Sequence, residues 1–247
     1  MKIIIRADDL GYSEGVNFGI LKSIDDGKIN NVSMMSNTAY AKKGYDLIKD
    51  KGVCVGLHAN ISGGYPVSNP TEIDTLVNGR VFHKSSFYRE VEEDIVDTEQ
   101  ARIEVEAQIE KFISITGVLP AYIDIHATNS GNFEEGVKEA ALKYGITFVP
   151  ADFSGRITNF KGYKLKTIVK SSEPNYEPKQ VFIDSINNNV QDLLLFIFHP
   201  GFIDKYLYNH SSLLIPRIME TDYLCSTDFK DYLNKKKIEC IRIDSLV

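Results

Sequence analysis

The sequence KIIIRADD, residues 2–9, is the stretch that most directly indicates the fold. Its run of isoleucines, residues 3–5, has the branched side chains of a buried β-strand, and two carboxylates follow it. The same arrangement recurs where residues 53–57 precede His58, residues 122–125 precede His126, and residues 193–198 precede His199. The carboxyl ends of parallel strands meet at one edge of a sheet, where active sites lie. We therefore expect these side chains to converge.

Helical patterns lie between the apolar runs and predict crossover connections. Ser13 is expected to cap the first helix, and Gly27 to end it. Strand–helix alternation repeated along the chain is typical of parallel strands with outer helices. We predict an α/β fold with one domain, residues 1–247. It is expected to form a (β/α) barrel-like fold, distorted or incomplete, with an open doubly wound sheet as the alternative.

The remaining elements are predicted from periodicity and from turn residues. Expected helices are 40–51, 86–116 (with a break at Asp97-Thr98), 132–144 capped by Asn132, 179–190, 212–224 and 227–236; expected strands are 32–35, 146–149, 165–169 and 238–243. Residues 62–84 are expected to form an irregular loop, and a loop of this length in a compact domain is usually functional. This loop and a second irregular stretch, 152–163, are candidates to close over the substrate.

Composition excludes several classes of function. The chain has 28 Lys and Arg against 34 Asp and Glu, a formal net charge of −6, which disfavours nucleic acid or an anionic membrane as a partner. Three widely spaced cysteines, Cys54, Cys225 and Cys240, do not form a disulfide framework or a CxxC metal site. No signal peptide and no run long enough to span a membrane is apparent, so a cytoplasmic location is expected.

The residue types at the predicted strand ends suit hydrolysis of an amide. One carboxylate and two neutral imidazoles can hold a divalent ion while leaving positions for water and substrate. A neighbouring carboxylate can take a proton from the water, and a further histidine can protonate the leaving amine. Asp124 is expected to be structural or to orient His126. His83 and His210 are expected at the surface.

Four motifs together resemble the YdjC-like, or chitooligosaccharide deacetylase, family. They are RADDLGYSEGVN (6–17), VGLHAN (55–60), IDIH (123–126), and HPGF (199–202) followed by Ser211, Ser212, Arg217 and Glu220. The resemblance covers nearly the whole chain, with the motifs in order and at matching spacings.

The resemblance implies a metal-dependent hydrolase that removes acetyl groups from N-acetylated amino sugars or short chitooligosaccharides. It also implies a homodimer and one divalent ion, magnesium or zinc. By resemblance, Asp9, His58 and His126 are the metal ligands and Asp8 is the general base. His199 is then the general acid or a stabiliser of the tetrahedral oxyanion.

Two departures from the family pattern concern the surroundings of these residues. The family commonly has further histidines after the third motif, where this chain has Ala127, Thr128 and Asn129, and it often has Asn at the position of Arg6. The altered wall leaves the particular sugar open. It also motivates one alternative, the hydrolysis of another small amide or ester. A sugar-binding protein without catalysis is a separate alternative, against which the intact set of Asp8, Asp9, His58, His126 and His199 argues.

Overall fold

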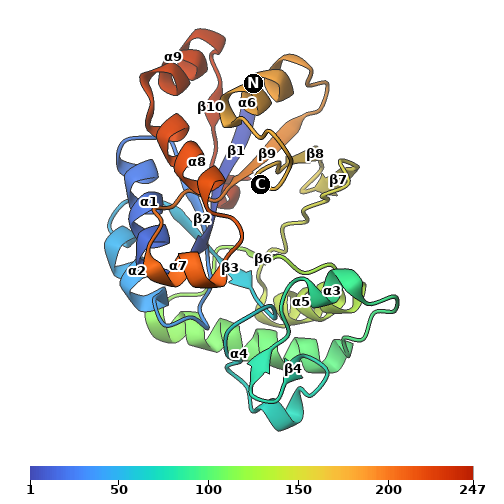
Figure 1. The fold of residues 1–247 in the computed structure, drawn as a ribbon. Coiled ribbons are helices and arrows are strands. Elements are labelled where there is room, and N and C mark those ends of the chain that lie inside the picture. The colour runs from blue at the N-terminus through green and yellow to red at the C-terminus, as the bar shows by residue number, and fades with distance from the viewer. Residues whose placement is uncertain (247) are drawn as a thin grey trace.

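The computed structural model describes residues 1–246 and is built on an eight-stranded, mostly parallel sheet (Figure 1). Seven strands follow the order β6-β3-β2-β1-β9-β8-β7, and β10 pairs with β1. All neighbours are parallel except β7 and β8. The strands of this sheet are β1 (Lys2–Leu10), β2 (Asn31–Met34), β3 (Cys54–Ala59), β6 (Ile123–Ile125), β7 (Ile157–Phe160), β8 (Tyr163–Ile168), β9 (Leu193–Phe198) and β10 (Glu239–Cys240).

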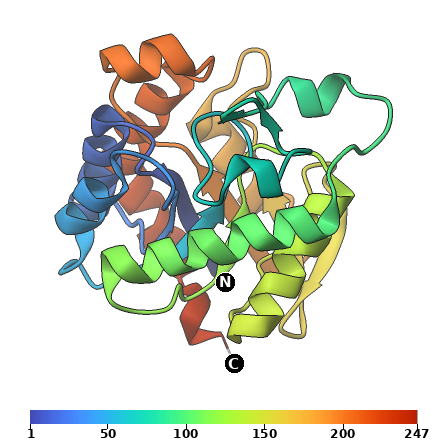
Figure 2. The same ribbon diagram turned by 90° about the horizontal axis from the view of Figure 1, so that it is seen from below.

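Seven of the helices in the described residues form one outer layer that follows the order of the strands. Contacts link α5 to α4, α4 to α2, α2 to α1, α1 to α8, and α8 to α6 and α9 (Figures 1 and 2). The helices are α1 (Glu14–Asp25), α2 (Ala41–Ile48), α3 (Phe87–Glu90), α4 (Thr98–Thr116), α5 (Gly131–Tyr144), α6 (Pro178–Asn187), α7 (Lys205–His210), α8 (Ile215–Cys225) and α9 (Thr227–Lys236).

This layering confirms the barrel-like prediction over a doubly wound sheet, which would carry helices on both faces. The barrel is incomplete. Within residues 1–246 the sheet ends at β6 on one side and at β7 on the other, so the strands form a curled half-barrel.

Alternation along the central strands separates two cores. In β1, Ile3 and Ile5 pack in the large core against the helices, whereas Ile4 belongs to a smaller cluster on the opposite face. The smaller cluster also receives residues from β9 and from the C-terminal segment, including Ile241. Because strand side chains alternate between faces, Arg6 and Asp8 follow Ile4 toward the inner face. The inner face of the half-barrel therefore carries the polar residues of the site.

Most predicted elements are confirmed, with shifts at their ends. Ser13 accepts a hydrogen bond from the Val16 amide and caps α1. The predicted break near Asp97 is real, because this side chain caps α4. The cap predicted at Asn132 is wrong: Ser130, two residues earlier, accepts from the Phe133 amide and caps α5.

Other predictions fail where pairing partners are few. Residues 146–149 do not form a strand, since only an isolated bridge joins Ile123 and Phe148. Residues 62–84 contain a short 3₁₀ turn (Pro70–Glu72) and a small hairpin of β4 (Val77–Asn78) and β5 (Val81–Phe82). Residues 152–163, expected to be irregular, contain β7, which pairs with β8. The strand expected at 238–243 is limited to β10, and a 3₁₀ turn (Ile243–Ser245) follows it. Helix α7 was not predicted. In the described part of the chain, no helix has the length and apolar character needed to cross a bilayer.

Candidate active site

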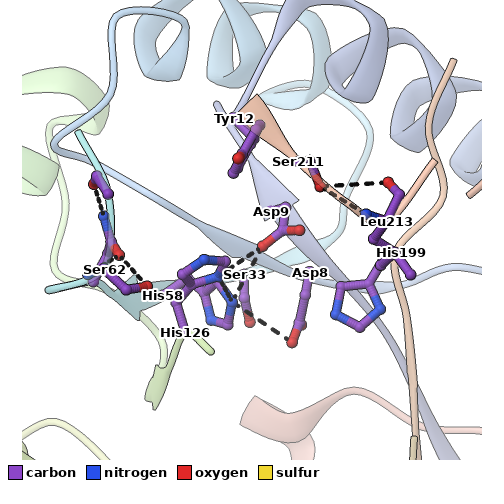
Figure 3. Close-up of polar contacts among 12 residues, drawn as sticks. Asp8, Asp9, Tyr12, Ser33, His58, Ser62, His126, His199, Ser211 and Leu213 are labelled. Carbon is purple, nitrogen blue, oxygen red and sulfur yellow. Dashed lines mark hydrogen bonds and ion pairs between the residues drawn. The ribbon is translucent and has the colours of Figure 1, made fainter. Parts of the chain in front are cut away.

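Three atoms that could bind a metal ion meet at the carboxyl edge of the sheet, each carried by a residue in or directly after a different strand. Asp9 Oδ1 lies 3.0 Å from His126 Nδ1 and 3.4 Å from His58 Nε2, and the two ring nitrogens are 3.2 Å apart (Figure 3). Asp9 belongs to β1, His58 belongs to β3, and His126 directly follows β6. The predicted convergence of these residues therefore exists as geometry.

The spacing of these atoms fits a divalent ion. Ligands about 2.1 Å from an ion and separated by 90° to 109° lie roughly 3.0 to 3.4 Å from each other. Asp9 Oδ1 is buried and has no hydrogen-bond partner within the described residues. An unpartnered buried carboxylate oxygen is costly unless a cation or a donor faces it. The residues present therefore fit such an ion.

A backbone irregularity lets two consecutive carboxylates serve one site. In a regular strand Asp8 and Asp9 would point to opposite faces. The pairing of β1 with β2 shifts register between Ala7 and Leu10, and Asp9 has φ = 75°, in the left-handed region that non-glycine residues rarely occupy. Strain of this kind persists where the surroundings enforce it, often at functional sites.

Asp124 holds His58 rather than His126. Its Oδ1 lies 2.7 Å from His58 Nδ1, so the contact fixes the ring with Nε2 toward Asp9. Its Oδ2 accepts from Ser33 Oγ at 2.8 Å and pairs with Arg6 Nη1 at 2.5 Å. The prediction that Asp124 orients His126 is thus wrong in its partner. Asp124 adjoins His58 in register across β3 and β6, which explains the choice.

Two buried arginines compensate the carboxylates. Arg6 forms a bidentate pair with Asp8, with Nε to Oδ1 at 2.6 Å and Nη2 to Oδ2 at 2.8 Å. Arg217 Nη2 donates to Asp9 Oδ2 at 2.6 Å. Asp8, His58 and Asp124 form a second group of possible ligands, but Arg6 contacts both of its carboxylates. A cation is therefore better placed at Asp9, where one oxygen is free of the guanidinium.

The same surroundings move the pKa values of the site in different directions. Burial disfavours a charged imidazole at His58, but the carboxylates of Asp124 and Asp8 outweigh it and raise its pKa to about 10. Burial also opposes ionisation of Asp9, yet Arg217 and His126 hold the pKa of this carboxyl well below its usual range. At His199, burial prevails and lowers the pKa of the imidazole.

His199 follows β9 and lies on the far side of Asp8 from the two other imidazoles (Figure 3). Its turn is held against α1 and α8. The Gly201 amide donates to Thr221 Oγ1 at 2.9 Å, and a Cβ placed on Gly19 would lie 2.3 Å from the Gly201 Cα. This close approach of two backbones requires glycine at position 19.

Further residues contact His199 and were given no role by the sequence. Glu220 Oε2 accepts from the His199 amide at 2.5 Å, and Ser171 Oγ lies 3.3 Å from His199 Nδ1. Arg217 and Glu220 stand in the C-terminal motif, which is the signal that pointed to them. Ser171 lies in a segment between β8 and α6 that carries no recognisable pattern.

The other two histidines lie outside the donor cluster. His210 is exposed at the end of α7, as predicted. His83 is half-buried and stacks on Phe87 at 4.1 Å between ring centroids, so its prediction as a plain surface residue is wrong. Nearer the site, the Tyr12 ring lies 6.4 Å from that of His126 and its hydroxyl donates to the His210 carbonyl.

The architecture and the donor set place this chain among α/β half-barrel proteins with a polar site at the carboxyl ends of their strands. The chain belongs to the YdjC-like protein family, whose model matches residues 2–235. A carbohydrate deacetylase of Clostridium beijerinckii is 30% identical over 256 residues and covers 100% of both chains. Carbohydrate deacetylase 1 of Listeria innocua is 29% identical over 255 residues, also with full coverage of both.

Solved structures share the fold. A protein of Enterococcus faecalis V583, named for a proposed cleavage of cellobiose phosphate, superposes with a TM-score of 0.86 at 21% identity, covering 100% of this chain and 98% of that one. A family 4 acetyl xylan esterase from Clostridium thermocellum, in complex with a cobalt ion, superposes with a TM-score of 0.56 at 12% identity. The superposition covers 90% of the esterase chain and 100% of this chain. At these identities the likeness is one of fold.

Proposed function

We propose that this protein is a metal-dependent deacetylase of N-acetylated amino sugars or short chitooligosaccharides. The observation that carries the proposal is the cluster of Asp9, His58 and His126, whose donor atoms lie within 4.8 Å of one another. Asp8 and His199 lie beside this cluster (Figure 3). Family membership and relatives named carbohydrate deacetylases support the sugar substrate.

Asp9, His58 and His126 would hold one divalent ion, magnesium or zinc. Such an ion, when bound, polarises a carbonyl and lowers the pKa of a coordinated water. Asp124 keeps the Nε2 of His58 pointed at the cluster, and Arg217 keeps Asp9 ionised. These two partners fix the orientation of His58 and the charge of Asp9 before substrate arrives.

Asp8 is the proposed proton acceptor. Its Oδ2 lies 3.8 Å from His58 Nε2, so it is close enough to the cluster to take a proton from a water that would attack the acetyl carbonyl there. The bidentate contact with Arg6 fixes the carboxylate plane and leaves little freedom to rotate. His199, on the other side of Asp8, is the proposed group that acts on the leaving amine or on the oxyanion.

Release of acetate tests the proposal. The protein is loaded with zinc or magnesium and incubated with N-acetylglucosamine oligomers, beside a panel of other N-acyl amides and acetate esters. Acetate release from the oligomers that is lost in Asp9→Asn is expected. Substitution of Asp46, an exposed partner of Lys42, by Asn is the matched control and should keep activity. Sugar binding with no acetate release in the metal-loaded protein would contradict the proposal.

One observation favours a second candidate, the hydrolysis of another small amide or ester by the same residues. Thr128, in the segment that departs from the family pattern, has a buried Oγ1 without a partner in the described residues. Ala127 before it has φ = 37°, a left-handed conformation that non-glycine residues rarely adopt. Faster turnover of a non-sugar substrate in the same panel would select this candidate.

Assembly as a homodimer and a cytoplasmic location are also proposed, on the family resemblance. Exposed apolar side chains on the contacting helices α1 and α8 support an interface between copies: Phe18, Ile215 and Ile218 are 42%, 60% and 39% exposed. Sedimentation velocity at micromolar concentration would show a dimer that Ile215→Glu dissociates. A monomer at all concentrations would contradict the dimer.

A further inference from the structure

A buried carboxylate behind His199 collects three hydrogen-bond donors. Glu220 on α8 is fully buried, and its Oε1 accepts from Ser171 Oγ at 2.6 Å and from the Tyr176 hydroxyl at 2.7 Å. Its Oε2 accepts from the His199 amide at 2.5 Å. The residues come from α8, from the segment between β8 and α6, and from the end of β9, so the contacts join three parts of the chain.

The single proton of the Ser171 hydroxyl determines whether Ser171 donates or accepts in its contact with the His199 imidazole. A serine hydroxyl has one proton to donate, and a carboxylate can only accept. The Ser171 proton is therefore directed to Glu220 Oε1. Ser171 Oγ, 3.3 Å from His199 Nδ1, then offers a lone pair to the ring. A hydrogen bond there requires the proton to be on Nδ1.

We propose that Ser171 and Glu220 are positioning residues that hold His199 in the Nδ1–H tautomer, leaving Nε2 as the nitrogen that exchanges the proton with the leaving amine. This inference rests on the proposed deacetylase function for its catalytic consequence. The tautomer itself rests on the contacts of Ser171 and Glu220 alone.

The tautomer distinguishes the two roles open to His199. A neutral imidazole with its proton on Nδ1 has a bare Nε2, which cannot donate to an oxyanion. The imidazolium form can give its Nε2 proton to the amine nitrogen as the amide C–N bond breaks and its electron pair moves to nitrogen. The ring then returns to the neutral Nδ1–H form. Asp8 holds the proton taken from water, and solvent returns a proton to His199 between turnovers.

Nitrogen NMR of the ring tests the tautomer without reference to activity. The zinc-loaded protein is labelled with ¹⁵N-histidine, and the His199 signals are identified by their loss in His199→Gln. We expect the Nδ1–H pattern in the native protein and a shift toward Nε2–H, the form favoured in water, in Ser171→Ala. Ser171→Thr keeps a hydroxyl and should restore Nδ1–H.

A matched variant separates positioning from simple loss of a buried hydroxyl. Tyr176→Phe removes a donor from the same Glu220 oxygen, but the Tyr176 hydroxyl bonds Glu220 and not the imidazole. We expect it to leave the tautomer of His199 unchanged. Glu220→Gln, which frees the Ser171 hydroxyl to turn toward the ring, should shift the tautomer in the same direction as Ser171→Ala.

Kinetics give the catalytic consequence. Acid–base catalysis contributes roughly 10²- to 10⁴-fold, and we expect Ser171→Ala to lose about 10- to 100-fold in kcat with KM little changed. An Nε2–H pattern in the native protein would overturn the inference even if deacetylation is observed. Conversely, an Nδ1–H pattern in a protein that releases no acetate would refute the proposed function and leave the tautomer assignment standing.

Discussion

His58 and His199 lie at the same edge of the sheet, yet their surroundings treat the imidazole in opposite ways. Asp124 and Asp8 raise the pKa of His58 to about 10 against the effect of burial, whereas burial lowers the pKa of His199. The carboxylates around His58 favour positive charge, either that of the protonated ring or that of a bound cation. His199 is held where a proton is easily given up. One half of the site is thus suited to an ion and the other to proton transfer.

The largest effect is expected from breaking the cation side. His58→Ala removes one of three donors, and we expect activity to fall about 10⁴-fold, since the several kcal/mol supplied by a bound ion correspond to losses of this order. Acetate release under saturating zinc measures it. Lys42→Ala, at an exposed ion pair on α2, is the control. Native activity in His58→Ala would show that an ion held by His58 is not needed for acetate release.

Breaking the proton-transfer side should leave the cation bound. His199→Gln is expected to lower kcat about 10²- to 10³-fold, within the range for loss of acid–base catalysis. Zinc affinity, measured by competition with a chelator, should stay close to native because His199 contributes no donor to the cluster. If zinc affinity fell as far as in His58→Ala, the two halves would not be separate.

Asp124 contacts His58 through Nδ1, whereas the Nε2 of the same ring faces Asp9. Asp124→Asn keeps the shape but weakens the contact with His58 Nδ1, and outer partners of metal ligands typically contribute 10- to 100-fold in affinity. We expect zinc affinity to fall by that factor. Because Arg6 loses a buried partner, circular dichroism must first show a folded protein. Unchanged affinity in a folded variant would mean that Asp124 serves Arg6 alone.

The smallest effect is the pH dependence of ion binding. His58 must lose its proton to act as a ligand, and its pKa of about 10 means that the ion-free protein carries this proton at pH 7. Binding should release close to one proton from this residue, and affinity should rise up to about tenfold per pH unit below pH 10. Calorimetry in buffers of different ionisation enthalpy measures the release. No proton release at pH 7 would contradict the raised pKa.

The same shift affects stability with a definite sign. The pKa of His58 is higher in the folded ion-free protein than the ordinary value of about 6.5 expected for an unfolded chain. Its stabilising contribution is therefore fully present below about pH 6.5. It is lost as pH rises through 10.

The cation side could be predicted from sequence because each donor follows an apolar run. Parallel strands place their carboxyl ends together, so the positions of Asp9, His58 and His126 along the chain were enough to expect a cluster. That Asp8 and Asp9 serve the same site depends on a bulge and on φ = 75° at Asp9, which the residue pattern does not indicate. Which histidine Asp124 contacts depends on the register between β3 and β6, which the sequence does not indicate either.

The proton-transfer side could be predicted only in part. His199 follows the apolar strand β9, and its position was expected. Glu220, on α8, and Ser171, in a segment without periodicity, contact His199 only because tertiary packing brings them together. Local patterns also misplaced the cap of α5, because Ser130 and Asn132 are both good caps and Asp94 binds the Asn132 amide. Side-chain competition of this kind is settled only in three dimensions.

Anomalous scattering from a crystal soaked in cobalt would locate the ion itself. We expect one strong peak per chain, bonded to Asp9, His58 Nε2 and His126 Nδ1, at about 2.0 to 2.3 Å from each. A peak between Asp8 and Asp124 instead, or no peak near these imidazoles at saturating cobalt, would contradict this expectation.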